Sequence, residues 1–447
     1  MVTLDQPLQY RSAMSPSPPR SPNGLLTPVE SAVSRAVDRV EQWFGLQWQQ
    51  YRPPFYSSVD MRNSGYKVAP VDTNLFPGGF NNLSAEAVSL AINAAAGAIN
   101  AAAGAVGRHC ADGCRVLLVP ESHTRNQFYL RNVARLKDIL ERSGLDVRLG
   151  ILNPEITEPA ELDAGDGRFV TVERLHRDGD HVGLSDFRPC TVILNNDLSA
   201  GLPEILQNLS AEQNLVPPLH AGWAVRRKSN HCASYDRAAG AFARFIDIDP
   251  WLVNTYSARV AGVNFHRREG EQQLSDAVAD VLGRIRLKYR EYGISEQPFV
   301  IVKADAGTYG MGVMKVTEPA DVIGLNARAR NKMSVIKDGM QVSELLIQEG
   351  VPTIEEVDGG SAERVVYMID RHVVGGFYRV NATRGRTDNL NASGMTFQPF
   401  PTAAGNDTES NGFYTYEVIG RLAALAAAME LDTADSHRVM PSATATV

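Results

Sequence analysis

A lysine followed at once by a glycine-rich segment is the clearest indication of chemistry in this sequence. The apolar run 299–302 ends in Lys303, and glycines recur in the next ten residues. Glycines let backbone N–H groups approach phosphate oxygens without interference from a Cβ atom, and the lysine adds a positive charge. Because a lysine that ends a buried strand needs a partner, we predict a phosphate site. Its predicted members are Lys303, Asp305, Gly307, Tyr309, Gly310 and Gly312.

Other phosphate-binding patterns fit this spacing less well. A Walker A loop places its lysine after the glycines, and a GxGxxG loop needs glycines at other intervals. A protein-kinase loop has its lysine on the next strand. A glycine hairpin without a ligand is the non-functional alternative. A lysine that ends a strand and precedes a glycine-rich hairpin instead resembles the ATP-grasp superfamily of ligases.

The resemblance to ATP-grasp enzymes implies roles for two later segments. A strand over 345–351 would contact adenine through its backbone, and an acid after it would hold the ribose, although an ordinary edge strand explains this segment equally well. The residues implied are Gln348, Glu349, Val351 and Glu356, with Glu355 as the other acid.

Arg364 and Arg379 stand at the start and the end of a predicted hairpin. Arginines bind carboxylate and phosphate oxygens through paired hydrogen bonds, so we predict that Lys303, Arg364 and Arg379 are catalytic; two solvated arginines are the alternative.

The elements that position these residues alternate between strand and helix. Strands are predicted at 115–120, 145–152 and 191–195, with a helix over 127–143, and this order indicates a parallel sheet. Polar clusters at 121–126 and 195–197 follow two of the strands, where ligands bind in open α/β sheets. Further strands are predicted at 297–303, 340–348, 364–369 and 372–380, with a tight turn at Asp370-Arg371. Helices are predicted over 28–48, 83–106, 274–292 and 414–431.

Length and composition indicate a globular protein of two or three domains. We predict a disordered Pro/Ser-rich segment at 1–28, an N-terminal α/β substrate domain at 29–270, an ATP-grasp nucleotide-binding region at 271–435 and a flexible tail at 436–447.

The net charge of -7 argues against broad nucleic-acid binding. Four scattered cysteines fit free thiols better than a disulfide or zinc framework. The absence of an apolar leader or span predicts a cytoplasmic protein, and a homo-oligomer is left open.

Over roughly 60–440 the chain resembles the proteobacterial glutamate–cysteine ligase family with an ATP-grasp-like domain. The segments 302–314 (VKADAGTYGMGVM) and 72–82 (DTNLFPGGFNN) carry that resemblance. It implies that ATP drives the joining of glutamate and cysteine into γ-glutamylcysteine, through an acyl phosphate; the substrate pair follows from the resemblance alone. ATP-grasp enzymes usually hold magnesium through an Asp and a Glu-x-Asn after the last helix, which this chain lacks. Asp388, Asn389 and Asn391 supply oxygens that suit Mg²⁺, and we take them as the predicted ligands.

Glutamate carries two carboxylates and an ammonium group, so its pocket needs charges of both signs. A Gly/Pro-rich loop could bind the ammonium group, and three basic residues after Trp223, together with Arg125, could bind a carboxylate. The predicted substrate residues are Asp72, Asn74, Asn81, Asn82, Arg125, Arg226, Arg227 and Lys228. Loop asparagines often only stabilise turns, and a basic triplet is often a solvated surface. The competing interpretations are another carboxylate–amine ligase such as glutathione synthetase, a nucleotide-binding regulator without turnover, and a scaffold protein.

Overall fold

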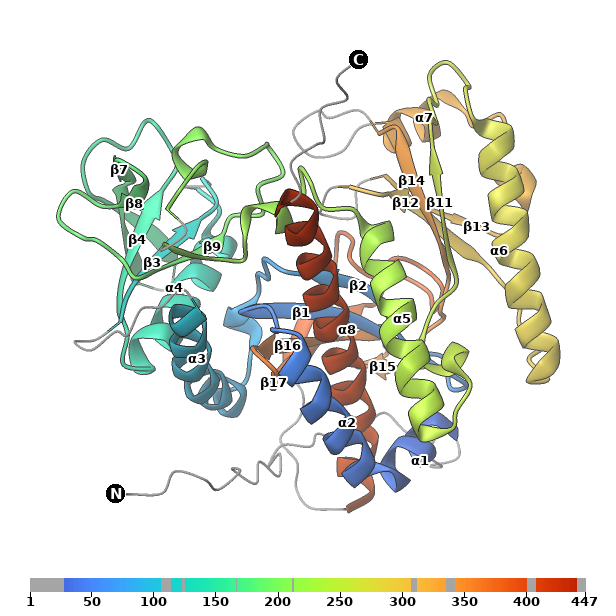
Figure 1. Cartoon of the computed structure of the whole chain (residues 1–447). Helices are drawn as coiled ribbons and strands as arrows, with labels where there is room; N and C mark the ends of the chain where they lie inside the picture. The colour runs from blue at the N-terminus through green and yellow to red at the C-terminus, as the bar shows by residue number, and fades with distance from the viewer. Residues whose placement is uncertain are drawn as a thin grey trace, which may run out of the picture.

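The computed structural model shows a mixed α/β protein with three main sheets (Figure 1). It describes residues 28–105, 114–122, 125–165, 167–210, 213–306, 312–334, 342–399 and 407–439. A largely parallel sheet lies on one side, an antiparallel sheet occupies the middle, and a four-stranded sheet lies on the other side (Figure 1). The mixed α/β class that the sequence indicates is therefore confirmed.

The first sheet confirms the predicted strand–helix–strand unit. Its order is β10 (Asn214–Val216), β9 (Thr191–Asn195), β3 (Arg115–Pro120), β4 (Asp146–Ile151), β6 (Arg168–Arg174) and β5 (Ala160–Gly165), and only the β5–β6 pair is antiparallel. Helices α3 (Ala85–Ala105) and α4 (Gln127–Arg142) pack on it. The side chain of Asn126 accepts from the backbone N–H of Tyr129 and caps α4. The carboxyl ends of β3 and β9 therefore meet at one edge of the sheet, beside the start of α4.

The middle sheet joins strands from both ends of the chain. Its order is β18 (Thr396–Pro399), β17 (His372–Asn381), β16 (Gly360–Ile369), β1 (Tyr56–Asn63) and β2 (Val68–Asn74), and β15 (Glu356–Val357) also pairs with β16. Ile369 pairs with His372 across the predicted Asp370-Arg371 turn, which is confirmed. Neither β1 nor β2 is predicted from the sequence, because polar residues interrupt their apolar pattern. The division at 270/271 stays a prediction, since this sheet uses residues from both sides of it.

The third sheet carries the predicted phosphate lysine. Its antiparallel order is β11 (Ser257–Ala261), β14 (Glu344–Glu349), β12 (Val300–Ala304) and β13 (Val313–Val316). Helix α6 (Glu271–Glu291) covers one face, and α7 (Ala327–Ser334) follows β13. The predicted strand at 340–348 begins later than expected, at Glu344, and residues 340 and 341 lie outside the described residues.

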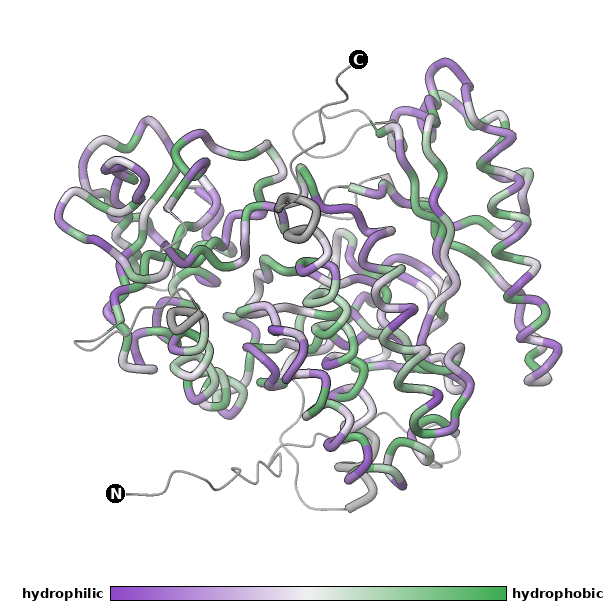
Figure 2. The backbone as a smooth tube through the Cα atoms, viewed as in Figure 1, coloured by the Kyte–Doolittle hydropathy of each residue, from purple (hydrophilic) through white to green (hydrophobic). Residues whose placement is uncertain are grey.

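The remaining helices cover the middle sheet. They are α1 (Pro28–Arg35), α2 (Val37–Gln50), α5 (Lys228–Ile246) and α8 (Asp407–Val439). The helix predicted over 28–48 is interrupted at Ala36, and α8 extends into the segment predicted as a flexible tail. Figure 2 shows hydrophobic turns along the middle of α8, whereas α6 alternates between hydrophobic and hydrophilic residues. This agrees with the burial of α8 from Tyr416 to Ala428 in the main core.

Short elements complete the chain. They are the ribbon of β7 (His176–Asp178) and β8 (His181–Gly183), and the 3-10 turns Phe80–Asn82, Glu204–Leu206, Leu219–Ala221, Pro250–Val253 and Pro319–Val322. The predicted disordered segment 1–28 lies outside the described residues except for Pro28. Within the part of the chain that the structure describes, we find no helix long and apolar enough to cross a membrane.

A buried ion pair ties α8 to the segment that leads into α5. Arg226 donates through Nε and Nη2 to the two carboxylate oxygens of Glu430, at 3.0 Å each, and through Nη1 to the carbonyl of Thr73, at 3.0 Å. His231 Nδ1 lies 3.2 Å from Glu430 Oε2. Burial alone would raise the pKa of Glu430, but Arg226 and His231 more than offset this effect and lower the pKa to about 2. The charged carboxylate therefore stabilises the folded chain.

We expect Glu430→Gln to lower the free energy of unfolding at pH 7 by about 3–5 kcal/mol, because it leaves Arg226 without a buried counter-ion. Glu430 binds protons less readily in the folded state than at its ordinary pKa of 4.5. Its contribution is therefore complete above pH 4.5 and is lost as the pH falls towards 2. Urea unfolding at several pH values should show that the difference in free energy of unfolding between wild type and variant becomes smaller below pH 4.5.

The matched control is Glu141→Gln, which alters an exposed pair with Lys137 on the surface of α4. We expect it to change stability by no more than about 0.5 kcal/mol. A Glu430→Gln protein as stable as wild type at pH 7 would contradict the stabilising role of the pair.

Candidate functional site

A cavity of about 520 Å³ lies where the three sheets meet. Strands of the middle sheet form one wall, β12 and β14 form another, and the carboxyl ends of β3 and β9 approach from the third side. It brings together predicted residues that are far apart in the sequence. Those that line it are Asp72, Asn74, Asn82, Lys228, Lys303, Gln348, Glu349, Val351, Arg379, Asp388, Asn389 and Asn391.

Two lysines share one carboxylate in the wall of this cavity. Lys303 comes from β12, Lys228 begins α5, and Asp72 lies on β2; the two Nζ atoms are 3.7 and 3.3 Å from Asp72 Oδ1. Lys303 also donates to the carbonyl of Val71 at 3.0 Å, and Lys228 Nζ lies 4.0 Å above the Trp223 ring. Two ammonium groups beside one carboxylate leave a positive charge that suits an anionic ligand.

The pKa values reflect this crowding of charge. Burial opposes ionisation of Asp72, but the ammonium groups of Lys228 and Lys303 outweigh burial and hold its pKa below the ordinary value. Burial also lowers the pKa of Lys228, with further lowering from Lys303 and Arg226, while Asp72 opposes the shift. An anion bound here would stabilise the charged form of Lys228.

The loop that follows Lys303 is described only in part. Gly307, Tyr309 and Gly310 lie outside the described residues, and Gly312 precedes β13 with φ of 63°. Asp305 is fully buried and does not line the cavity. Its carboxylate accepts from the backbone N–H and the hydroxyl of Ser229, both at 2.7 Å. Asp305 therefore fixes the start of α5, and with it Lys228, against the strand that carries Lys303.

The end of β14 forms the edge predicted to hold a nucleotide base. Gln348 donates to Thr255 at 3.0 Å, and Glu349 pairs with buried Lys67 at 2.9 Å and accepts from Trp251. The side chain of Glu349 thus supports its neighbours, and residues 349–351 line the cavity together with apolar Phe299, Ile301 and Val313. A Cβ atom on Gly350 would lie 2.1 Å from the Phe299 ring, so this position requires glycine.

The acids predicted to hold the ribose lie away from the cavity. Glu356 is exposed on β15, and Glu355 is buried and paired with Arg364 at 2.7 Å. Neither side chain lines the cavity, so the structure gives no support for ribose binding by either acid.

Arg364 does not share a cleft with Arg379, contrary to the prediction for the hairpin. In the β16–β17 register, Glu363 is opposite Arg379 and Arg364 is opposite Tyr378. Because successive side chains point to opposite faces of a sheet, Glu363 and Arg379 face the cavity while Arg364 faces α8. Arg364 is fully buried there, with its guanidinium 4.0 Å from the ring centre of Tyr416. We correct its role to a structural one.

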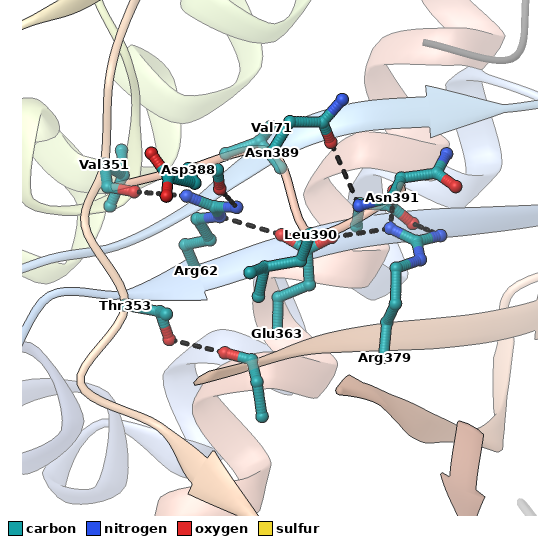
Figure 3. A network of polar contacts seen from close by, with 12 residues as sticks. Arg62, Val71, Val351, Thr353, Glu363, Arg379, Asp388, Asn389, Leu390 and Asn391 are labelled. Atoms are coloured by element: carbon teal, nitrogen blue, oxygen red, sulfur yellow. Dashed lines mark hydrogen bonds and ion pairs between the residues drawn. The ribbon is translucent and has the colours of Figure 1, made fainter. Parts of the chain in front are cut away.

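A chain of charges that includes Arg379 crosses the cavity wall (Figure 3). Arg379 Nη1 lies 2.6 Å from both Asp60 Oδ2 and Glu363 Oε1, and Arg62 Nε lies 2.8 Å from Glu363 Oε2. Asp60, Arg62 and Glu363 also line the cavity, yet none is predicted from the sequence. The spacing Asp60-x-Arg62 could have indicated the first two, because it puts both side chains on one face of β1.

The predicted magnesium ligands lie beside this chain of charges (Figure 3). Asp388 Oδ2 accepts from the backbone N–H of Gly385 at 2.9 Å, and Asn389 Oδ1 accepts from that of Asn391 at 3.0 Å. Among the described residues, no group of three or more His, Cys, Asp or Glu side chains could hold a metal. The carboxylate and amide oxygens here match the preference of Mg²⁺, which often completes its shell with water and nucleotide phosphates.

The remaining predicted substrate residues fall into two groups. Asn74 and Asn82 line the cavity, and Asn74 Oδ1 also accepts from the backbone of Phe76 at 2.9 Å; Asn81 donates to Asn82 at 3.0 Å. Asn81, Arg125, Arg226 and Arg227 do not line it. Arg226 is held by Glu430 as described above, Arg227 pairs with Glu344 at 2.9 Å, and Arg125 is exposed.

Two acids beyond the parallel sheet were noted as parts of polar clusters but not predicted as ligands. Glu121 follows β3 and Asp197 follows β9, and both are buried and line the cavity. Glu121 Oε1 accepts from the backbone N–H of Asp197 at 3.0 Å, which holds the two strand ends together. Their position at the carboxyl ends of parallel strands is where open α/β sheets bind ligands.

Comparison with known proteins identifies the family. The sequence matches the glutamate–cysteine ligase family model over residues 30–431. A crystal structure of a candidate gamma-glutamylcysteine synthetase from Methylobacillus flagellatus KT is 50% identical, with a TM-score of 0.84, and the match covers 94% of this chain and 100% of that chain. No curated protein matches significantly.

A second solved structure, the D-alanyl-alanine synthetase A of Vibrio cholerae O1 biovar eltor str. N16961, is 11% identical with a TM-score of 0.34, covering 69% of this chain and 81% of that chain. A similarity at that level supports no inference about the fold. The match over residues 30–431 confirms the family resemblance seen in the sequence and disfavours a regulator or a scaffold: the chain belongs to the glutamate–cysteine ligase family.

Proposed function

We propose that the cavity joins L-glutamate to L-cysteine at the expense of ATP, through an ATP-grasp-like arrangement of β12, β13 and β14. The observation that carries this proposal is the convergence of Lys303, Lys228 and Arg379 on one cavity that also receives the carboxyl ends of β3 and β9. The cationic part suits phosphates. The polar ends of the parallel sheet suit amino acids.

The nucleotide would lie along the end of β14. Apolar Ile301 and Val313 would contact the base. The backbone N–H groups of Glu349 and Gly350 already donate to Tyr256 and Phe299, and the carbonyl of Val351 accepts from Arg62, so the remaining backbone groups of 349–351 would offer the base its hydrogen bonds. The phosphates would then reach Lys303 and Lys228. Bound Mg²⁺, held by oxygens of Asp388, Asn389 and Asn391, would neutralise phosphate charge.

The amino acids would lie towards the parallel sheet. Glu121 and Asp197 are carboxylates placed to accept hydrogen bonds from a substrate ammonium group, and Asn82 lies on the same cavity. Asp72 serves this purpose less well, because Lys228 and Lys303 already share it. Arg379 is the cation that approaches the substrate carboxylates from the middle sheet.

The chemistry divides into two displacements. An oxygen of the glutamate γ-carboxylate attacks the terminal phosphorus of ATP, and ADP leaves. The amine of cysteine then attacks the carbonyl carbon, phosphate leaves, and the nitrogen loses a proton. The residues of this chain mainly hold the reactants and stabilise charge on the transferred phosphoryl group.

Product analysis tests the reaction directly. With ATP, Mg²⁺, glutamate and cysteine, we expect mass spectrometry to detect a dipeptide with the mass of γ-glutamylcysteine, together with ADP and phosphate. Omission of any one substrate should abolish the dipeptide. Glutamate-dependent phosphate release without dipeptide would retain the acyl-phosphate chemistry and exclude cysteine as the amine. A folded, ATP-binding protein that forms no product would contradict the proposal.

Replacement of Lys303 tests the phosphate role. We expect Lys303→Ala to lower kcat by about a hundredfold or more, because charge on the transferred phosphoryl group loses a fixed cation. Lys137→Ala on the surface of α4 is the matched control and should leave kcat unchanged. Circular dichroism should show both variants folded. Near-normal turnover by Lys303→Ala would remove Lys303 from the mechanism.

A further inference from the structure

Arg62 joins three segments that meet at the cavity, and it is buried on β1. Its Nε donates to Glu363 at 2.8 Å, its Nη1 to the carbonyl of Val351 at 3.2 Å, and its Nη2 to the carbonyl of Asp388 at 2.7 Å. Figure 3 shows this guanidinium between the Val351 and Asp388 segments. One side chain thus binds β16, the segment that follows β14 and the loop that carries Asn389 and Asn391.

Two of these segments have separate tasks in the proposed function. The backbone of 349–351 is the edge for the base, and the 388–391 loop carries the oxygens proposed for Mg²⁺. Thr353 and Arg386 add a second tie between them, since the backbone N–H of Thr353 donates to Arg386 and Arg386 Nε donates to Thr353, at 2.9 and 3.0 Å. These bonds keep the segments together, whereas Arg62 fixes both against the middle sheet.

Only an arginine can make this set of contacts. Its three nitrogens donate in one plane in different directions, whereas a lysine offers a single nitrogen. Glu363 balances its charge and is shared with Arg379 at 2.6 Å, so the position of Arg62 is also linked to a cation on β17. Arg62 therefore does not need a ligand of its own to be satisfied in this wall.

We propose that Arg62 is a positioning residue that couples the nucleotide edge to the metal-binding loop, so that magnesium strengthens nucleotide binding only while Arg62 holds the two in register. This inference rests on the proposed function. Arg62 would touch neither the reacting atoms nor the nucleotide.

Calorimetric binding of a non-hydrolysable ATP analogue, with and without Mg²⁺, tests the coupling without turnover. For Arg62→Lys, we expect the affinity measured with Mg²⁺ to fall by about tenfold or more. The affinity without metal should change much less, so the increase in affinity for the analogue that Mg²⁺ produces should become smaller. Hydrogen exchange should become faster in the amides of 384–391. A readout of stability alone would not separate these effects.

Arg421→Lys is the matched control, because Arg421 is also buried, pairs with Glu41 and lies 4.3 Å from the ring centre of Phe44, away from the cavity. Arg421→Lys should lower Tm and leave the magnesium-dependent gain in affinity for the analogue unchanged. Should Arg62→Lys not fold, Glu363→Gln gives the same measurement, because it weakens the ion pair that orients the Arg62 guanidinium towards the two carbonyls, and a smaller loss of the magnesium-dependent gain is expected.

An unchanged magnesium-dependent gain in the folded Arg62→Lys protein, or in Glu363→Gln when it is the variant used, would overturn the coupling role, whatever the change in Tm. A wild-type protein that does not bind the analogue at all would instead overturn the proposed function. The two failures are therefore distinguishable.

Discussion

Two carboxylates, Asp72 and Glu363, each lie between two cations, and the geometry of the cavity depends on this sharing. Asp72 on β2 contacts Lys228 and Lys303 from two other elements, and Glu363 on β16 contacts Arg62 and Arg379. Removing such charges from water is costly unless they are paired. Each carboxylate therefore holds together strands and helices that are distant in the chain. In the first group two lysines face one carboxylate, which leaves a positive charge that suits an anionic substrate. In the second group Asp60 also pairs with Arg379, so the two arginines are balanced by two carboxylates.

The alternation of side chains along a strand decides which charged side chains face the cavity. Glu363 and Arg364 are neighbours in sequence, yet one faces the cavity and the other the core beneath α8. The arginine that enters the core is neutralised by Glu355, and burial in turn raises the pKa of that glutamate although Arg364 opposes the shift. A shift of one residue in the β16–β17 register would exchange these roles, so the hairpin turn at Asp370 and the register shift between Tyr367 and Met368 together fix the site indirectly.

Several acidic and basic residues near the reactive groups act on other protein groups. Asp305 fixes the start of α5, Glu349 is held by Lys67 and Trp251, and Arg226 is held by Glu430. Each of them supports a neighbour that faces the cavity: Lys228, the edge after β14, and the strand that carries Asp72. The placement of the cavity residues thus depends on buried polar contacts behind them, as precise positioning of reacting groups requires.

Local patterns were sufficient to predict the parallel sheet, the strand ending in Lys303 and the hairpin at Asp370-Arg371, because each depends on neighbours in sequence. The family was also evident from the sequence, through the segments 302–314 and 72–82. The strands β1 and β2 were not predicted, since β1 finds its partner in β16 at the other end of the chain and β2 joins the sheet only through β1. Asp60, Arg62 and Glu363 were missed for the same reason, and the face of Arg364 was predicted wrongly. The sequence determined which residues could bind phosphate or carboxylate; only the long-range strand register decided which of them face one cavity, because that register sets the direction of every side chain on the sheet.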